Sequence, residues 1–322
     1  MPRYIRNTVI TAKVETAAGV DAAPTGLANA VLVSEMSITP LDAKNVDRNV
    51  IRGYFGASEQ LVGVASVKVS ITVELAGSGA AATAPAMSAL FQGCALAEAS
   101  LTTPTRVEYT PVSTALKTLT IYYYDDGVLH KLVGAMGTFS LSAKVGERPT
   151  LKFEFTGLDG TMSVANTAGT YSAWKAPVAM TKANVVDITL GATYGAGVLS
   201  GGTVYSSTGL ELAMGNAVGY SALLSAERVD ITDRDVTGSI ELDLTATQEV
   251  AFMASVKANT LQSLALTIGT VSGSKLIIHA PTIQLINPKK SELNGTRLCG
   301  YDLRAVPTPT GSGNDELRLA FV

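Results

Sequence analysis

The sequence has few charged residues and very few of the residues that build catalytic or metal centres. Charged residues make up 16% of the 322 residues, and there are two histidines and two cysteines. Cys94 and Cys299 are too few for a disulfide-based fold or a four-cysteine zinc site. One bridge between them stays open, although two buried free thiols are the expectation. With 24 Lys and Arg against 27 Asp and Glu, the net charge is −3, which argues against a dedicated nucleic-acid binder or a polybasic membrane anchor.

Long apolar runs are missing as well. The most apolar stretch, residues 79–99, is interrupted by Pro85, Gln92 and Glu98, so it lacks the roughly 18 successive apolar residues that a membrane helix needs. The first residues carry charges and no apolar run of signal-peptide length. We therefore expect no membrane anchor and no secretion signal.

The residues that could do chemistry do not form a catalytic pattern. His130 and His279 fall near equivalent strands of the two halves, so a shared site, or a dyad with a cysteine, is not favoured. Three carboxylates at residues 230, 233 and 235 come nearest to a calcium loop, but arginines lie among them and the distant Glu is absent. We expect no enzyme activity, no metal and no cofactor.

Alternation of apolar and polar residues with a period of two dominates the chain. From Val67 to Leu75 the apolar side chains fall on one face of a strand and the polar ones on the other. The pattern recurs in residues 117–124, 137–143 and 151–155, and Asp125-Asp126-Gly127 predicts a hairpin turn between two such runs. The sequence therefore predicts a mainly β protein with half-buried antiparallel strands.

The same order of elements occurs twice. A helix is expected after Pro85, where apolar residues recur at 87, 90, 91 and 94. In the second half a strand at 240–244 precedes a helix-like stretch, Gln248–Lys257, with Thr245 and Gln248 at capping-box spacing. Further strands at 264–268, 275–285 and 301–303 follow in the first half's order. We infer a tandem duplication.

Each half carries a long polar connection before its first strong strand, and such connections are usually functional or extend as hairpins. In residues 42–63 the candidate contact residues mix arginines, aromatics and acids: Asp47, Arg48, Arg52, Tyr54, Phe55 and Glu59. In residues 213–237 the corresponding set contains Tyr220, Arg228, Asp230, Asp233 and Arg234. The chain has few charges and no catalytic or metal-binding pattern. The alternating strands and long connections therefore favour a structural protein whose sheet edges are covered by self-assembly into a ring.

Several segments resemble one known family. The segment AKVET…GVD…PTG…NAVLV in residues 12–33, the strand at 66–75, the helix after Pro85 and the run LKFEFTGL at 151–158 are similar to the major tail tube proteins of bacteriophages with long non-contractile tails. The resemblance covers the whole chain in element order and is weaker in the second repeat, where CGYDLRA replaces LKFEFTG. It implies two tandem β-sandwich tube domains, each with one flanking helix, that build a ring with an inner β-barrel.

The duplication and the composition predict a division of the chain, and the resemblance implies a set of partners. Residues 1–30 would form an N-terminal arm, 31–160 the first tube domain, 161–184 a linker, and 185–322 the second domain with a C-terminal arm or strand. Fused domains imply homotrimeric rings that stack head to tail in the virion tail, assembled in the host cytoplasm. Tape-measure, tail-terminator and tail-tip proteins are the implied partners.

In such a tube, double-stranded DNA would pass through the lumen without specific binding. Glu74, Glu241 and Asp243 are the candidate lumen-wall residues, because acidic side chains do not hold phosphate. Residues 47–59 would contact the next ring. The alternatives are the tube of a phage-derived secretion or bacteriocin particle, and a β-rich binding module on a tail or cell surface.

Overall fold

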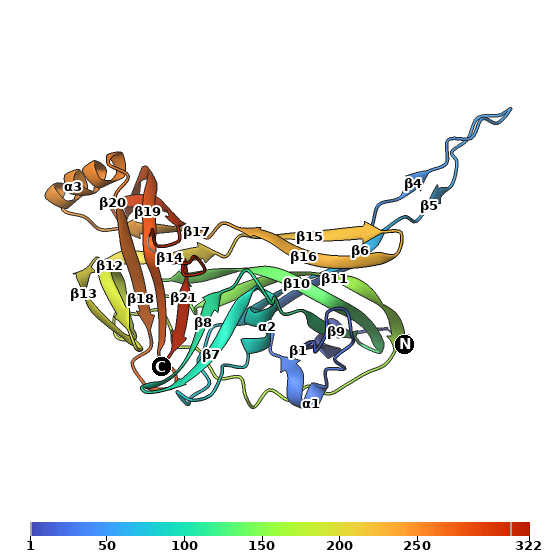
Figure 1. The fold of residues 1–322 in the computed structure, drawn as a ribbon, viewed down its shortest axis with the longest axis horizontal. Coiled ribbons are helices and arrows are strands. Elements are labelled where there is room, and N and C mark those ends of the chain that lie inside the picture. The colour runs from blue at the N-terminus through green and yellow to red at the C-terminus, as the bar shows by residue number, and fades with distance from the viewer. Residues whose placement is uncertain (1, 310) are drawn as a thin grey trace.

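A computed structural model of the chain describes residues 2–309 and 311–322. The protein is mainly β, as the alternation predicts, and its strands pair antiparallel (Figure 1). The described helices are short: η1 (Ile5–Asn7), α1 (Gly26–Asn29), α2 (Ser88–Gly93) and α3 (Ala246–Lys257).

The first half is built from two layers of strands that share one long strand. In one layer β3 (Glu35–Ala43), β6 (Ala65–Glu74), β11 (Thr150–Val164) and β10 (Val128–Lys144) lie side by side in that order. In the other layer β10 pairs with β9 (Leu119–Asp125), β9 with β1 (Thr8–Val14), and β1 with β2 (Ala30–Val31). β10 can belong to both layers because its pairing with β9 and with β11 shifts register between residues 132 and 136.

The core between these layers comes from the predicted alternation. Val67, Val69, Ile71 and Val73 of β6 are buried, whereas the residues between them face away from the core. Phe153 and Phe155 of β11 pack beside them, and α2 adds Phe91, whose ring lies 5.8 Å from that of Phe153. The predicted turn is present as well, since Asp126 and Gly127 adopt φ angles of 40° and 95° in the two-residue turn between β9 and β10.

The second half repeats this order of pairing. β14 (Ser207–Ala213), β17 (Thr237–Leu242), β20 (Thr296–Ala305) and β19 (Leu276–Leu293) form one layer, and β19 also pairs with β18 (Leu261–Ile268). β18 pairs with β12 (Val185–Gly195) and β12 with β13 (Val198–Val204). The register repeats too: Ile71 lies opposite Phe153 in the first half and Ile240 opposite Tyr301 in the second. Thr245 and Gln248 form the expected capping box of α3. These repeats support the duplication, while the boundary at 161–184 stays a prediction.

Two sets of pairings join the halves. Residues 140–144 of β10 pair with residues 209–213 of β14. The eight strands β3, β6, β11, β10, β14, β17, β20 and β19 therefore follow one another in a continuous series, which we call the long sheet. On the other side β21 (Arg318–Phe321) pairs with both β19 and β8 (Thr105–Pro111), and β8 pairs with β7 (Leu96–Thr102).

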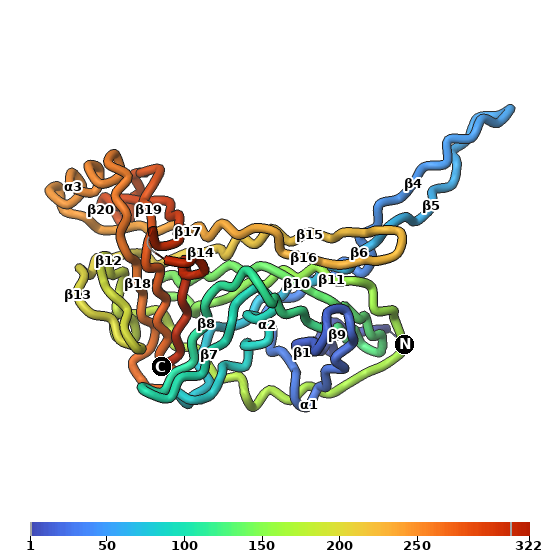
Figure 2. The backbone as a smooth tube through the Cα atoms, viewed as in Figure 1, coloured from blue at the N-terminus to red at the C-terminus, as the bar shows by residue number. Residues whose placement is uncertain are grey.

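Both connections predicted as functional loops are hairpins that prolong strands of the long sheet (Figure 2). Residues 44–64, with β4 (Val46–Asp47) and β5 (Gln60–Leu61), continue β3 and β6; we call them the projecting arm. β15 (Asn216–Leu223) and β16 (Ala226–Arg234) continue β14 and β17; we call them the docked hairpin, because it contacts β10 and β11. Figure 1 shows the arm extending away from the rest of the chain.

The terminal segments expected to form arms contain strands of the fold. Residues 8–14 form β1, whose whole length pairs with β9, and residues 318–321 form β21 between the halves. Cys94 and Cys299 are both free and buried, as expected.

Candidate assembly surfaces

The long sheet has one apolar face in the core and one polar face. The polar face carries serines, threonines and charged residues from all eight strands, because alternation along each strand places them opposite the buried side chains. Three neighbouring depressions in this face are lined by residues of both halves, among them Ser70, Glu154, Ser142, Glu211, Ser239 and Glu241. The polar face thus continues across the junction between the halves.

Cations on the polar face are paired with acids. Lys144 of β10 contacts Glu211 of β14 at 2.6 Å, so this ion pair spans the junction, and it lowers the pKa of Glu211 below its usual value. The other lysines and the arginine on the strands of this face each have an acid within 3.0 Å, in the pairs Lys68–Asp42, Lys152–Glu154, Lys289–Asp302 and Arg304–Asp235. Because these side chains are largely exposed, each pair adds little stability, but the pairing leaves the face close to neutral.

The structure places the candidate wall residues at related positions. Glu241 lines a depression of the polar face together with Lys144 and Lys289. Glu74 ends β6 and contacts Arg148 at 3.0 Å. Asp243 directly follows β17 and is exposed. Glu74 and Asp243 are counterparts in the two repeats, since Ile71 and Ile240 share one register position.

The long sheet ends in two unpaired strand edges in the part of the chain that the structure describes. At one end β3 pairs only with β6. At the other end residues 289–293 of β19 pair only with β20. Unpaired N–H and C=O groups on such an edge are a ready template for another strand.

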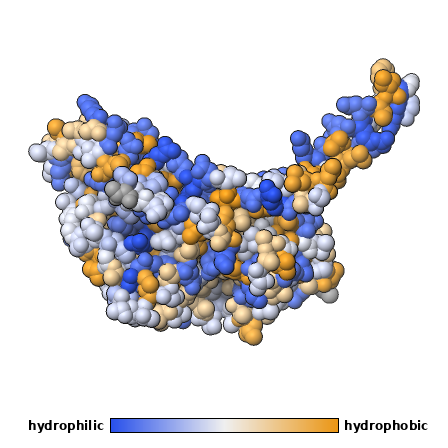
Figure 3. All heavy atoms as spheres, in the orientation of Figure 1, coloured by the Kyte–Doolittle hydropathy of each residue, from blue (hydrophilic) through white to orange (hydrophobic). Residues whose placement is uncertain are grey.

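The projecting arm holds the six predicted contact residues. Glu59 pairs with Arg48 and, at 3.2 Å, with Arg52, while the Gln60 side chain donates to Asp47 at 2.5 Å. These polar contacts tie the two strands of the arm together. Tyr54 and Phe55 are 70% and 107% exposed. Apolar residues also run along the arm (Figure 3), namely Val46, Val50, Ile51, Leu61, Val62 and Val64. A surface of this kind is typical of a contact site for another protein.

The five candidate residues of the second repeat lie on the docked hairpin in different environments. Arg228 and Asp230 form an exposed ion pair at 2.5 Å, and Asp233 is exposed. Burial raises the pKa of Tyr220. Arg234 contacts Glu316 at 3.1 Å with both side chains nearly buried, and it also donates to the carbonyl oxygen of Val112. Arg234 thus holds the hairpin to both the first repeat and the C-terminal segment.

The chain is similar to one family over nearly its full length. Residues 5–321 match the profile of the family described as Phage tail tube protein. The chain belongs to this family. Among curated proteins no match reaches significance. The tail tube family assigns the chain a structural, non-enzymatic role in the virion tail. In the described part of this tail tube protein no helix is long and apolar enough to cross a membrane, and no group of three or more His, Cys, Asp or Glu could hold a metal ion.

Two buried polar contacts of the tail tube chain had no sequence signal. Asn216, at the base of the docked hairpin, donates from its side chain to the carbonyl oxygens of Cys94 and Gly137, each at 2.9 Å. Its own N–H donates to the Thr138 hydroxyl at 3.2 Å. Asn216 therefore fixes the direction in which the hairpin leaves β14. An Asn in a polar loop is so common that only the folded chain identifies it.

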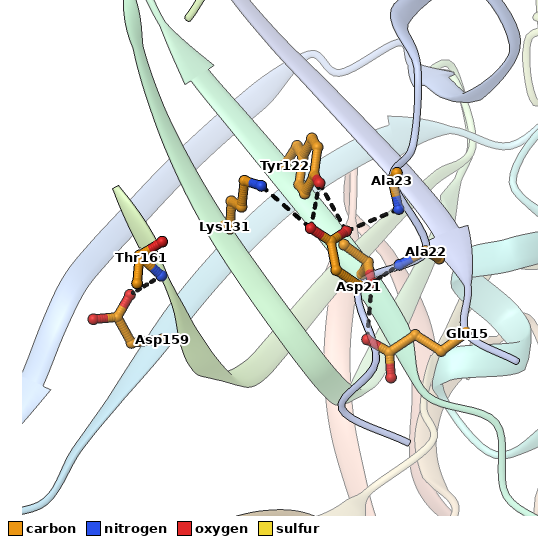
Figure 4. A network of polar contacts seen from close by, with 9 residues as sticks. Glu15, Asp21, Ala22, Ala23, Tyr122, Lys131, Asp159 and Thr161 are labelled. Atoms are coloured by element: carbon orange, nitrogen blue, oxygen red, sulfur yellow. Dashed lines mark hydrogen bonds and ion pairs between the residues drawn. The ribbon is translucent and has the colours of Figure 1, made fainter. Parts of the chain in front are cut away.

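The second contact is a polar network that holds the N-terminal segment (Figure 4). The buried carboxylate of Glu15 accepts hydrogen bonds from the hydroxyls of Thr118 and Thr120 at 2.6 and 2.8 Å, and from the N–H groups of Gly19 and Gly134 at 2.7 and 2.8 Å. Nearby, Asp21 accepts from the Tyr122 hydroxyl at 2.6 Å and contacts Lys131 at 3.2 Å.

The network also affects the ionisation of Asp21. Burial raises the pKa of Asp21, but hydrogen bonds from Tyr122 and Ala23 and the charge of Lys131 outweigh burial, so the pKa lies below its usual value. A carboxyl whose pKa is lowered on folding stabilises the fold above its ordinary pKa, and this contribution is lost as the pH falls. The contacts of Asp21 therefore hold this segment above the ordinary pKa of Asp21 and weaken as the pH falls.

Proposed function

We propose that this chain assembles into trimeric rings that stack into the phage tail tube, through which DNA leaves the virion. The observation that carries the proposal is the junction of β10 with β14, where the two repeats of one chain already join edge to edge in the long sheet. The unpaired edges of β3 and β19 are the repeat counterparts of β14 and β10. A ring forms when β19 of one chain pairs with β3 of the next in the same way.

The internal junction also predicts the register between chains. Ser142 lies opposite Glu211 within the chain. Leu141 pairs with Leu151 in the first repeat, and Lys290 pairs with Cys299 at the matching position of the second repeat. Leu141 and Lys290 are therefore counterparts. The residues that follow them, Ser142 and Ser291, are counterparts as well. The counterpart of Glu211 is Ser37, because Glu211 pairs with Ser239 and Ser37 with Ser70. Ser291 of one chain is therefore expected opposite Ser37 of its neighbour.

In this ring the polar face of the long sheet lines the lumen. Its cations are already paired with acids, so they offer little to a passing phosphate backbone. Glu74, Glu241 and Asp243 would lie on or beside this wall, and residues 47–59 would contact the next ring. Assembly in the host cytoplasm, with tape-measure, tail-terminator and tail-tip proteins, completes the proposal.

The test is a pair of cysteines across the proposed junction, combined with electron microscopy. The test variant carries Ser37→Cys and Ser291→Cys in a background without the native cysteines (Cys94→Ala, Cys299→Ala). This variant is assembled, imaged by electron microscopy and treated with a short thiol-reactive crosslinker. Dimers and trimers on a denaturing gel, with no larger species, are expected together with threefold rings. The matched control, Ser142→Cys with Glu211→Cys, should crosslink only within one chain. Tubes that yield no Ser37–Ser291 product would reject this junction, and a ladder that ends at six chains would reject the trimer.

A further inference from the structure

The two hairpins of the long sheet start from equivalent strands but end in different surroundings. In the docked hairpin Asn216 and Val229 are buried, and most other residues of β15 are half-buried. In the projecting arm residues 44–62 are exposed apart from the half-buried Ser58. Both hairpins continue a strand pair of the same sheet, so their difference in burial comes from the strands that lie beside them.

The neighbour of the docked hairpin is the first repeat. β14 borders β10, so the hairpin that continues β14 crosses onto β10 and β11. There Val218 lines a depression together with Thr138 and Thr156 on the polar face. The projecting arm continues β3, which is the last strand of the sheet, so no part of the described chain lies beyond it.

We infer that the root of the projecting arm, residues 42–49 and 57–64, docks on β19 and β20 of a second copy in the same ring. This inference rests on the proposed function, since pairing of β3 with β19 of a second copy would place those strands beside the arm. β19 and β20 are the counterparts of β10 and β11, on which the docked hairpin lies. Exposed apolar residues of the root, including Val46, Leu61 and Val62, would be covered there.

The arm is longer than the docked hairpin, and the extra length lies at its tip. Thr39 and Lys68 of the first repeat correspond to Ala213 and Thr237 of the second, so 28 residues (40–67) stand where the second repeat has 23 (214–236). In the docked hairpin, β15 spans eight residues, from Asn216 to Leu223. The same number of residues in the arm, counted from Asp42, ends at Asn49. Residues 50–56, with the fully exposed Ile51 and Phe55, would pass beyond the neighbouring chain and remain available to the next ring. One hairpin thereby makes contacts within a ring and contacts between rings.

The repeat predicts which residues meet. Lys44 stands eight residues after Met36, as Val218 stands eight residues after Leu210, and Met36 and Leu210 lie opposite Ile71 and Ile240. Phe155 pairs with Val69 in the first repeat, and Leu303 pairs with Gly238 at the matching position of the second. The residues that follow them, Thr156 and Arg304, are therefore counterparts. Lys44 of one chain is thus expected near Arg304 of its ring neighbour.

The experiment is a crosslink between Lys44→Cys and Arg304→Cys in assembled tubes of the cysteine-free background. Covalent dimers and trimers with nothing larger are expected, because the ring closes after three chains. A ladder beyond three chains would mean that the root binds the next ring, and tubes without product would mean that it binds neither; both outcomes overturn the inference. Val218→Cys with Thr156→Cys is the matched control and should link only within one chain.

The Ser37–Ser291 crosslink separates this inference from the proposed ring. If that pair links and the Lys44–Arg304 pair does not, the ring stands and only the arm docking fails. If the Lys44→Cys, Arg304→Cys variant does not assemble, amide hydrogen exchange on the unaltered protein decides. Exchange at residues 43–49 should slow at least tenfold when free chains become tubes, and unchanged exchange would overturn the docking.

Discussion

At the scale of single residues, buried polar contacts hold segments of the tail tube chain together more strongly than its exposed ion pairs do. Glu15 accepts four hydrogen bonds from groups on three segments of the first half. Arg234 and Asn216 hold the docked hairpin in place. The exposed ion pairs of the polar face, by contrast, are of the kind that contributes little.

Replacing Glu15 by Ala should therefore destabilise the fold. It leaves four donors without their acceptor, and unpaired buried donors cost about 1–3 kcal/mol each before relaxation and water entry, so a net loss of roughly 3 kcal/mol is expected. Urea unfolding followed by tryptophan fluorescence measures it. Glu147→Ala, which alters an exposed turn residue, is the control and should change stability by less than about 0.5 kcal/mol. Equal stability of the two variants would show that the network is not structural.

At the scale of elements, the two long hairpins differ in whether they have a partner within the chain. The docked hairpin links the repeats within one chain, whereas the projecting arm has no partner in the described chain and exposes aromatic residues at its tip. Aromatic and arginine side chains are the usual anchors of protein interfaces. These side chains support our proposal that the tip contacts the next ring.

Deleting residues 49–58 should give a folded, soluble protein that does not form tubes. The deleted segment is exposed apart from the half-buried Ser58, and it contributes only Arg52 to an exposed ion pair, with Glu59, so the melting temperature should shift by no more than about 2 °C. Electron microscopy of the concentrated protein reads out assembly. Tyr54→Ser with Phe55→Ser keeps the length of the arm and should block stacking as well, while Val250→Ser on α3, also exposed, should not. Tubes formed by the deletion variant would exclude the tip as the contact between rings.

At the scale of the whole molecule, one chain with its two repeats would make up a third of the closed ring that we propose. The long sheet presents a continuous polar face, and its cations are matched by carboxylates. Such a face suits a conduit, because each unmatched cation would bind phosphate and release counterions, which slows DNA sliding.

Charge reversal on this face should therefore slow DNA ejection without preventing tube assembly. Phage carrying Glu241→Lys and Asp243→Lys should eject DNA on the order of tenfold more slowly at low salt, with the difference shrinking as salt rises. Ala251→Lys with Ala254→Lys adds charge to exposed positions of α3, on the opposite side of the sheet, and serves as the control. Equal ejection rates in the two variants would show that this face does not line the lumen.

The sequence alone determined part of the strands, the turn between β9 and β10, the positions of α2 and α3, and the repeated order of these elements. Alternation in residues 65–75 fixes which side chains of β6 are buried, and Thr245 with Gln248 fixes the start of α3. These features depend on neighbours along the chain, so period and spacing reveal them. The resemblance to tail tube proteins in residues 12–33 agreed with the family match over residues 5–321.

Only the tertiary structure decided how these elements join. It placed residues 8–14 in a sheet rather than in an arm, inserted β21 between β8 and β19, and paired β10 with β14. It also separated two similar polar connections into a docked hairpin and a projecting arm. Strand edges carry the same backbone groups whatever their side chains, so which edge meets which, and which edge is left for another chain, depends on the assembled layers and not on the local sequence.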